Sequence, residues 1–423
     1  MKEAFIHHIW NLKIIAFEGL KTFHGSEIEI INFGKINYNS GPDFIDAEII
    51  IGGQLWVGNV EMHVNSSDWD LHQHSTDLSY GNVILHVVWN HDKEITFLRA
   101  RNVETLIISQ FVKKEVIYNY EKILNHTFNT LPCKGLIDNI DWNKISLWFE
   151  RLIIERLEEK SKNIHLLYKQ SNQNWEEVTF KLFALNFGLK INKDPFEIWC
   201  NSFPFYVLQK NQNSKYLIEA LFFGQSGFLE NPQDNYMLEL KKEYDFLKHK
   251  YNLNPISSSV FNFFSLRPQG FPTIRLAQLA SIYGTQKHLF STIISFQNLT
   301  QIEEYFKKIS PSEYWDTHYV FGKESKKVTK NISTSKIHNL IINTILPLKF
   351  SYEISLGQID LDFYLSILQA LKTENNSIIK LFIDTGFPIK NSKDSQVILH
   401  LKKWYCDEKK CLNCAIGREV LTP

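Results

Sequence analysis

Residues 41–64, GPDFIDAEIIIGGQLWVGNVEMHV, constrain the fold of this chain more than any other stretch. Two runs of mostly apolar and β-branched residues are joined by a Gly-Gly pair, the pattern of a β-hairpin with a tight turn. Side chains alternate along a strand, so Glu61 and His63 are expected on one face. A hairpin can also bring Asp43, at the start of its first strand, beside Glu61 near the end of the second. The sequence therefore predicts a buried hairpin that ends in a cluster of ionisable side chains.

The segments around this hairpin predict the order helix, three strands, helix, strand. Residues 3–23 have apolar positions at helical spacing, and the segment SEIEIINF after them alternates as a strand does. Beyond the hairpin, Ser66 or Ser67 can cap a short helix, and residues 83–89, VILHVVW, have the composition of a buried strand. We expect these elements to form an N-terminal domain over residues 1–115.

The remainder of the chain, residues 116–423, is expected to form a mainly helical domain. The polar, basic segment 322–336 predicts an exposed loop. Sustained amphipathic helical periods occur at 142–170, 174–188, 237–251 and 271–284.

The composition excludes several classes of protein. No apolar run approaches the ~20 residues that a membrane-spanning helix needs, and the start, MKEAFIHHIW, lacks the apolar core of a secretory signal. Five cysteines, an odd number in a long chain, argue against a disulfide scaffold. We therefore expect a cytoplasmic protein without a membrane partner, and its oligomeric state is left open.

The net charge of zero hides an asymmetry along the chain. Residues 1–100 hold 13 acidic and 6 basic residues, a balance of −7, so the remainder holds 33 and 40, a balance of +7. The same hundred residues carry 8 of the 15 histidines. Acidic residues and histidines that are concentrated in one segment suit a metal site, and the basic remainder of the chain could bind a polyanion. By charge alone, ordinary surface variation explains the basic remainder better.

The predicted elements resemble the αβββαβ core of the PD-(D/E)XK, or restriction-endonuclease-like, nuclease fold. The family pattern is Pro-Asp, a variable gap, then an acidic residue, any residue and lysine across a hairpin. Here Pro42-Asp43 is separated by 17 residues from Glu61-Met62-His63, with histidine where lysine is usual. The resemblance implies an α+β protein, with this nuclease-like domain followed by the mainly helical one, that cuts phosphodiesters with a bound metal.

The chemistry of such a site explains its residue types. Two nearby carboxylates repel, and Mg²⁺ or Mn²⁺ between Asp43 and Glu61 would relieve this. The ion would polarise a phosphodiester oxygen and lower the pKa of a bound water. His63 could orient that water as a general base or as an imidazolium. Glu3 is the candidate for the acidic residue that these nucleases place on their first helix, and Glu18 is the alternate.

A second set of histidines overlaps this site. A Zn²⁺ hydrolase could use Glu61, His63 and one of His72 and His74. Those last two histidines point to different faces of a regular helix, so both could reach one metal only if their segment is irregular. Otherwise they form Asp–His pairs on a helix or contact the substrate. His86 is expected to be a hydrogen-bonded core histidine.

The sequence thus favours a divalent-metal-dependent nuclease acting on DNA or RNA. Two alternatives remain, namely the zinc hydrolase and a non-catalytic scaffold that keeps a degenerate nuclease fold to bind nucleic acid or protein. Arg267 and Arg275, in the segment SLRPQGFPTIRLAQ, could grip a phosphate backbone, although either could instead pair with carboxylates between helices.

The C-terminal segment predicts a second metal site. Cys406, Cys411 and Cys414 are close enough in sequence for three thiolates to bind one ion, which we expect to be a structural Zn²⁺. An iron–sulfur cluster is less expected because it needs a fourth cysteine. Three reduced thiols in a packed tail are the alternative. The candidates for a fourth ligand are His400, Cys133 and Cys200.

Eight segments together resemble an uncharacterised family known only as domain of unknown function 2851. They are HIW, GPDF, WVGNVEMH, SSDWDLHQH, NVILHVVW, FGQSGFL, RPQGFPTIRLAQLA and CxxxxCLNCAIG. The resemblance covers nearly the whole chain and implies a full-length member. It supplies no activity, so the site assignments rest on the chain's own residues. Members of this family open with an acidic residue ahead of the HIW-like segment, which favours Glu3 over Glu18.

Overall fold

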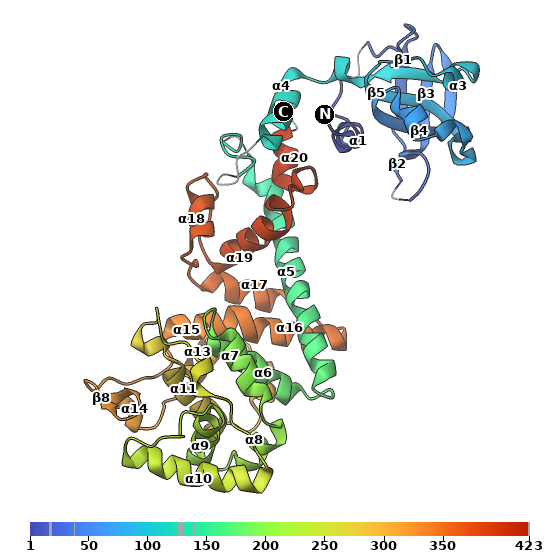
Figure 1. Cartoon of the computed structure of the whole chain (residues 1–423). Helices are drawn as coiled ribbons and strands as arrows, with labels where there is room; N and C mark the ends of the chain where they lie inside the picture. Colours follow the sequence, from blue (N-terminus) through green and yellow to red (C-terminus); the bar gives the residue numbers. More distant parts are fainter. Residues whose placement is uncertain (17–18, 38, 126–130, 139, 422–423) are drawn as a thin grey trace. The chain divides into compact units, whose positions relative to one another are not determined.

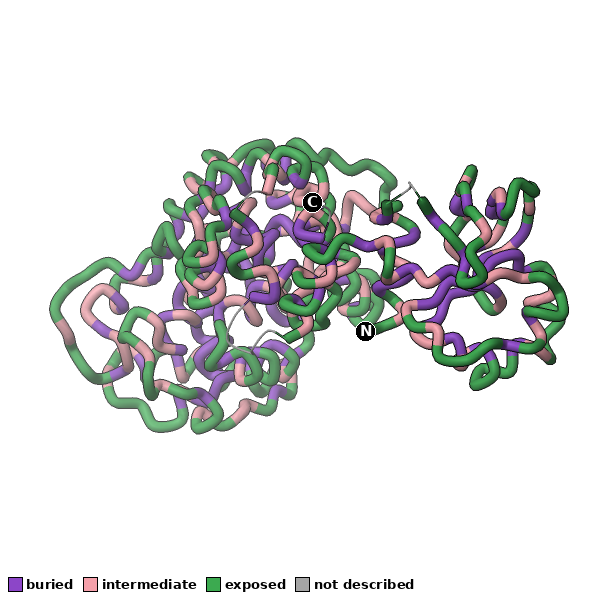
Figure 2. The backbone as a smooth tube through the Cα atoms, turned by 90° about the horizontal axis from the view of Figure 1, so that it is seen from above, coloured by how far each residue is buried: buried purple, intermediate pink, exposed green. Residues whose placement is uncertain are grey.

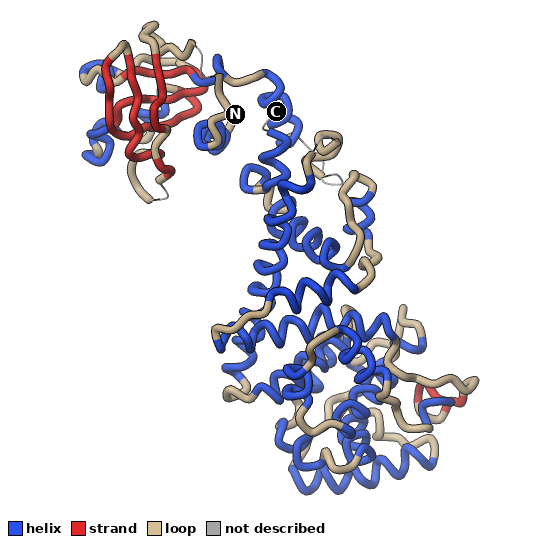
Figure 3. The backbone as a smooth tube through the Cα atoms, turned by 180° about the vertical axis from the view of Figure 1, so that it is seen from behind, coloured by secondary structure: helices blue, strands red, loops and turns tan. Residues whose placement is uncertain are grey.

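The structure, a computed structural model, describes all residues of the chain except 17–18, 38, 126–130, 139 and 422–423. The protein is α+β, with an N-terminal mixed sheet followed by mostly helical chain (Figure 3). It forms two compact units, here called the sheet unit and the helical unit. The sheet unit comprises residues 1–148, 376–387 and 399–423, and the helical unit comprises residues 149–375 and 388–398. The domain boundary expected after residue 115 stays a prediction.

The sheet is built from six strands in the order β1-β3-β4-β5-β6, with β2 paired to β3 off this path (Figure 1). The β3–β4 pair is antiparallel, whereas the β4–β5 and β5–β6 pairs are parallel. The strands are β1 Ile28–Asn32, β2 Lys35–Ile36, β3 Phe44–Ile51, β4 Gln54–Asn65, β5 Val83–Asn90 and β6 Glu104–Ile107.

The predicted hairpin is confirmed as β3 and β4. Gly52 and Gly53 have φ of 58° and 82°, the positive values that a two-residue hairpin turn of this hand requires. Strand β4 pairs with β3 as far as Val60, which lies opposite Phe44. The last residues of β4 therefore extend past the beginning of β3, at the point where Asp43 enters the strand.

One face of the sheet is covered by α1, Glu3–Asn11, whose large apolar side chains Phe5, Ile6, Ile9 and Trp10 are fully buried. The ring of Phe5 lies 5.9 Å from Trp89 of β5, and Trp10 lies 6.5 Å from Phe44 of β3. Figure 2 shows buried residues, in purple, along both the sheet and the helices of the chain. The helix expected over 3–23 was predicted too long, because Lys13 takes a left-handed φ of 58° soon after Asn11.

The opposite face carries the crossover from β4 to β5, formed by α2 Asp68–Leu71 and two short 3₁₀ turns. Trp69 of α2 is fully buried and belongs to a small apolar cluster with Val83, Ile95 and Leu98. The short helix was predicted, but neither candidate serine hydroxyl caps it. Both hydroxyls instead bind the carboxylate of Asp92, at 2.9 Å from Ser66 and 2.6 Å from Ser67.

The remaining helices confirm the expected helical character of the rest of the chain. The predicted segments 142–170, 174–188, 237–251 and 271–284 correspond to α5, α6, α10 and α11. The basic segment 322–336 is only partly an exposed loop, since Lys330 is buried and α15 begins within it. Among the described residues, no helix has both the length and the apolarity to cross a membrane.

The bounds of these further elements are as follows. The sheet unit contains α3 Thr96–Ala100, α4 Lys114–Leu124, α18 Ser377–Ile383 and α20 Ala415–Leu421, and α5 Trp142–Gln170 and α19 Ser392–Leu401 run through both units. The helical unit contains α6 Trp175–Gly188, α7 Lys193–Asn201, α8 Phe205–Asn211, α9 Lys215–Gln225, α10 Asn235–Tyr251, α11 Pro272–Thr285, α12 Leu289–Ser295, α13 Leu299–Lys307, α14 Tyr314–Thr317, α15 Thr334–Leu340, α16 Leu346–Leu356, α17 Leu361–Ala370, β7 His318–Val320 and β8 Lys323–Glu324.

Substitution of Gly58 in β4 tests how closely β5 packs against this strand. A Cβ at Gly58 would lie 2.5 Å from Ile84 Cγ2 and 2.6 Å from the carbonyl oxygen of Asn82. We expect Gly58→Ala to lower the free energy of unfolding by about 1–3 kcal/mol, measured by urea titration of the full chain. Gly81→Ala is the matched control, since open space surrounds that position, and should stay within about 0.5 kcal/mol of wild type. Equal losses in the two variants would contradict the packing argument.

Candidate metal centre

At the end of the hairpin, the carboxylates of Asp43 and Glu61 each accept a hydrogen bond from a backbone N–H of the segment opposite. The backbone N–H of Asp43 donates to Glu61 Oε2 at 3.1 Å, and the N–H of Met62 donates to Asp43 Oδ2 at 2.9 Å. We call this reciprocal pair of bonds the clasp. It brings together the two carboxylates that the sequence analysis selected.

The clasp places two acidic groups close together in a poorly solvated site. Glu61 is only 4% exposed, and the side chain of Asp43 is 20% exposed. Burial and the neighbouring Asp43 charge raise the pKa of Glu61 well above its usual value. Two carboxylates under these conditions are stabilised by a hard cation that neutralises them.

Helix α1 adds two side chains beside Asp43. Glu3 and His7 are one helical turn apart, and His7 Nε2 lies 3.1 Å from Asp43 Oδ2 and 3.8 Å from Glu3 Oε1. Each of these three residues has a potential ligand atom within 4.8 Å of the others. Glu3 therefore lies where the sequence placed an acidic residue, whereas Glu18 falls outside the described residues. His7 was missed, although its spacing of four from Glu3 was a usable signal.

Electrostatics couples this first group to its neighbours. Burial raises the pKa of Glu3, and the Asp43 charge raises it further. Burial lowers the pKa of His7, but the adjacent Asp43 carboxylate outweighs this effect, so the pKa of His7 is raised overall. His7 can thus act as a cationic partner of Asp43 until a metal ion replaces its proton.

Three histidines form a second group next to the first. Potential ligand nitrogens of His63, His72 and His74 all lie within 4.8 Å of one another. His72 ends α2, Gln73 takes a left-handed φ of 60°, and His74 begins the next 3₁₀ turn. This irregular backbone is the condition under which His72 and His74 were expected to reach one metal.

Glu61 connects the two groups. Its Oε2 belongs to the clasp, while its Oε1 lies 3.1 Å from His74 Nε2 and 3.6 Å from His63 Nε2. The predicted ion between Asp43 and Glu61 stays a prediction, and each of these carboxylates also faces a set of potential ligands of its own. The seven side chains, here called the carboxylate–histidine cluster, are Glu3, His7, Asp43, Glu61, His63, His72 and His74.

The surroundings of His63 and His74 favour the neutral state that binds metals. Burial, with the nearby His74 and His72, lowers the pKa of His63 to about 3. Burial and His72 also lower the pKa of His74. The imidazolium role considered for His63 does not fit these surroundings, whereas a role as a neutral base or ligand does.

Two imidazole nitrogens of the cluster each face a carboxylate oxygen. The Nε2 atoms of His7 and His74 are buried and lie 3.1 Å from oxygens of Asp43 and Glu61, respectively. In each pair a divalent ion could take the place of the imidazole or carboxyl proton.

His86 lies directly behind His63. It is fully buried, as expected for a core histidine, and its Nε2 lies 2.9 Å from His63 Nδ1. If His63 binds a metal through Nε2, its Nδ1–H donates to His86, which then carries its own proton on Nδ1. That Nδ1 has no hydrogen-bond partner in the described part of the chain. His86 is thus a positioning residue for His63.

The two arginines proposed to contact substrate lie in the helical unit. Arg267 is exposed just before a 3₁₀ turn, and among the described residues it forms no ion pair with a carboxylate. Arg275 donates from Nη1 to Gln278 Oε1 at 2.9 Å, and burial lowers its pKa to about 10. Arg275 therefore has a packing role within its own helix, and only Arg267 keeps the character of a surface cation.

The fold and cluster together define an α+β protein with a partly buried carboxylate–histidine site suited to divalent cations. The family model described as "Protein of unknown function (DUF2851)" matches residues 3–377, and the chain belongs to this family. The match includes every residue of the cluster and ends before Cys406. Neither a curated protein nor a solved structure matches the chain.

Asp43→Asn separates the structural role of the clasp from its charge. The amide oxygen can still accept the Met62 N–H, but the repulsion with Glu61 is removed. In the presence of EDTA we expect the stability of the variant to stay within about 1 kcal/mol of wild type, because the lost repulsion with Glu61 offsets the lost ion pair with His7. The thermal stabilisation that Mn²⁺ or Zn²⁺ gives the wild type should be lost.

The control for this measurement is Glu29→Gln, which neutralises an exposed carboxylate on β1 of the same sheet. Its stability should stay within about 0.5 kcal/mol of wild type, and its response to metal should be unchanged. A clear loss of metal-free stability in Asp43→Asn, with the metal response retained, would contradict the assigned role of the charge.

His7→Gln tests the ligand that the sequence analysis missed. Loss of the imidazole beside Asp43 should weaken Mn²⁺ binding by about 10-fold or more in a calorimetric titration. His8→Gln is the matched control on the same helix, because His8 is outside the cluster and burial lowers its pKa to about 4. Equal Mn²⁺ affinities in the two variants would remove His7 from the site.

Proposed function

We propose that the protein is a divalent-metal-dependent nuclease that hydrolyses phosphodiester bonds of DNA or RNA. The observation that carries this proposal is the convergence of Asp43 and Glu61 at the end of the hairpin, with Glu3 approaching from the first helix. The order α1, β1, β3, β4, α2, β5 supports a relationship to the PD-(D/E)XK fold. In that pattern these acidic positions bind the catalytic ion.

The residues of the cluster divide into a buried and an accessible part. Glu61 and His63 are buried, whereas His72 is exposed and the side chain of Glu3 is 41% exposed. A substrate phosphate would therefore approach over Glu3 and His72, on the solvent side of the cluster. Asp43 lies between the two parts and can hold an ion that both sides share.

A bound divalent cation would supply Lewis acidity and lower the pKa of a coordinated water. Glu3, His7 and Asp43 would hold such an ion on the accessible side. Glu61 and the neutral His74 next to it can accept the proton of an attacking water. His63, at the position where the nuclease pattern has lysine, lacks a permanent charge, so it acts as a ligand or base in this proposal.

A zinc-dependent hydrolase is the second candidate, because three imidazoles converge beside Glu61. Neutral histidine nitrogens and one carboxylate are a frequent ligand set for catalytic Zn²⁺. In this alternative His63, His72 and His74 would bind the ion, Glu61 would serve as a ligand or base, and the substrate need not be a phosphodiester. The non-catalytic scaffold is tested by the same experiment.

The test uses the full-length protein, stripped with EDTA and resupplied with Mg²⁺, Mn²⁺ or Zn²⁺, on labelled single- and double-stranded DNA and RNA. We expect cutting with Mg²⁺ or Mn²⁺, and a loss of about 100-fold or more in Asp43→Asn and Glu61→Gln, since a catalytic ion contributes several kcal/mol. Glu29→Gln should cut as wild type does.

The other outcomes decide between the alternatives. Hydrolysis restored by Zn²⁺ alone, lost in His72→Ala and His74→Ala but kept in Asp43→Asn, would replace the nuclease with the zinc hydrolase. Nucleic-acid binding without cutting, unchanged in Asp43→Asn, would indicate the scaffold. Cutting that is unaffected in Asp43→Asn and Glu61→Gln would refute the proposed site.

A further inference from the structure

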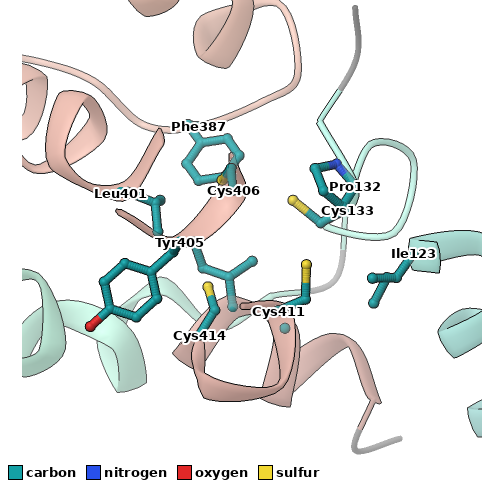
Figure 4. A pocket seen from close by; sticks show the side chains of 11 residues that line it. Ile123, Pro132, Cys133, Phe387, Leu401, Tyr405, Cys406, Cys411 and Cys414 are labelled. Carbon is teal, nitrogen blue, oxygen red and sulfur yellow. The ribbon is translucent and has the colours of Figure 1, made fainter. Parts of the chain in front are cut away.

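Four cysteines line one small cavity in the sheet unit (Figure 4). The cavity has a volume of about 20 Å³, which is room for roughly one water-sized sphere or a single ion. Figure 4 shows Cys133, Cys406, Cys411 and Cys414 around a common space. The other residues that line the cavity are Ile123, Pro132, Phe387, Leu401, Tyr405, Ile416 and Gly417.

The four thiols come from two segments that are far apart in the sequence. In the C-terminal segment, Cys406 ends a π-helical turn that follows α19, Cys411 begins a 3₁₀ turn, and Cys414 lies between that turn and α20. Cys133 precedes Cys406 by 273 positions (406 minus 133). All four are free thiols. A chance meeting of reduced cysteines does not account for four of the five cysteines of the chain at one cavity.

The structure also decides among the candidates for a fourth ligand. Cys133 lines the cavity, whereas Cys200 belongs to the helical unit, and His400 is not among the described residues that line it. The sequence left these three open because nothing in their spacing relates them to the C-terminal cysteines. Cys133 completes the set.

The lining of the cavity leaves the four sulfurs as the potential ligands of an ion. Among the described residues that line it, the other side chains are apolar apart from Tyr405 and include no carboxylate or imidazole. Metal binding displaces thiol protons, so each of the four cysteines can supply one thiolate.

The turn between Cys411 and Cys414 is built to stabilise thiolate. Backbone N–H groups of Gly417 and Ile416 donate to the sulfur of Cys414. Such hydrogen bonds are the usual outer partners of metal-bound sulfur. A Cβ at Gly417 would lie 2.0 Å from the carbonyl oxygen of Cys411, so only glycine lets the turn pack so closely on α20.

We propose that Cys133, Cys406, Cys411 and Cys414 bind one Zn²⁺ ion in a structural Cys₄ site. Among the described residues, no three of these sulfurs lie within 4.8 Å of one another, so the ion draws the thiols inward. Zn–S bonds of about 2.3 Å place tetrahedral sulfurs about 3.8 Å apart. The small cavity favours a single ion over an iron–sulfur cluster. The ion joins the segment around Cys133 to the C-terminal segment, independently of the proposed nuclease site.

The first test is residue-resolved alkylation of the full-length protein, read by mass spectrometry with and without a strong chelator. We expect the four cysteines that line the cavity to be protected from alkylation until the chelator removes zinc, and then to react together. Cys200, a buried thiol away from this cavity, is the internal control, and its alkylation should respond little to the chelator. Reactivity of the four cysteines that does not depend on the chelator would overturn the proposal. This measurement does not depend on any variant folding.

The second test identifies the ion and separates this site from the carboxylate–histidine cluster. Elemental analysis should show that Cys133→Ser loses one equivalent of zinc relative to wild type, while Cys200→Ser and His400→Gln lose none. Replacement of zinc by Co²⁺ should give the thiolate-to-cobalt charge-transfer bands that histidine and carboxylate ligands cannot give. Iron with acid-labile sulfide, or zinc retained in full by Cys133→Ser, would overturn the assignment of a Cys₄ zinc site.

Discussion

The clasp between Asp43 and the strand beside it is the interaction on which the rest of the structure depends. Strand β4 continues beyond the start of β3, and its backbone would lose a partner there. The carboxylate of Asp43 accepts a hydrogen bond from the N–H of Met62, and the carboxylate of Glu61 accepts one from the N–H of Asp43. The same two bonds complete the edge of the hairpin and fix two negative charges side by side. The hydrogen bonds that order this end of the sheet are therefore the same ones that bring the charges of Asp43 and Glu61 close together.

Much of the fold could be predicted because its signals are local. The hairpin follows from two mostly apolar, β-branched runs joined by Gly52-Gly53, and β5 follows from its continuous apolar run. The end of α1 could not be predicted in this way, because apolar spacing continues past Asn11 while the backbone at Lys13 turns left-handed. Tertiary contacts, rather than periodicity, determine where that helix stops.

The candidate site likewise has features that the sequence could predict and features that depend on distant segments. Asp43, Glu61 and the histidines near them were accessible to sequence reasoning because strand alternation and spacing bring them together. The neutral state of His63 was not, since it follows from burial and from its neighbours rather than from a motif. The packing of Arg275 and the meeting of Cys133 with the C-terminal thiols likewise depend on segments that are distant in sequence.

The two kinds of partner along β4 imply an order of assembly. Its pairing with β3 closes a two-residue turn, which forms in microseconds in isolated hairpins. Its parallel pairing with β5 requires the crossover with α2 to pack first, and such non-local contacts form later. His72 and His74 lie in that crossover, so the cluster stays incomplete until the crossover has packed. The complete set of ligands at this site is consequently assembled late in folding. A nascent chain with only the hairpin formed would hold Asp43, Glu61 and His63 without the imidazoles of His72 and His74.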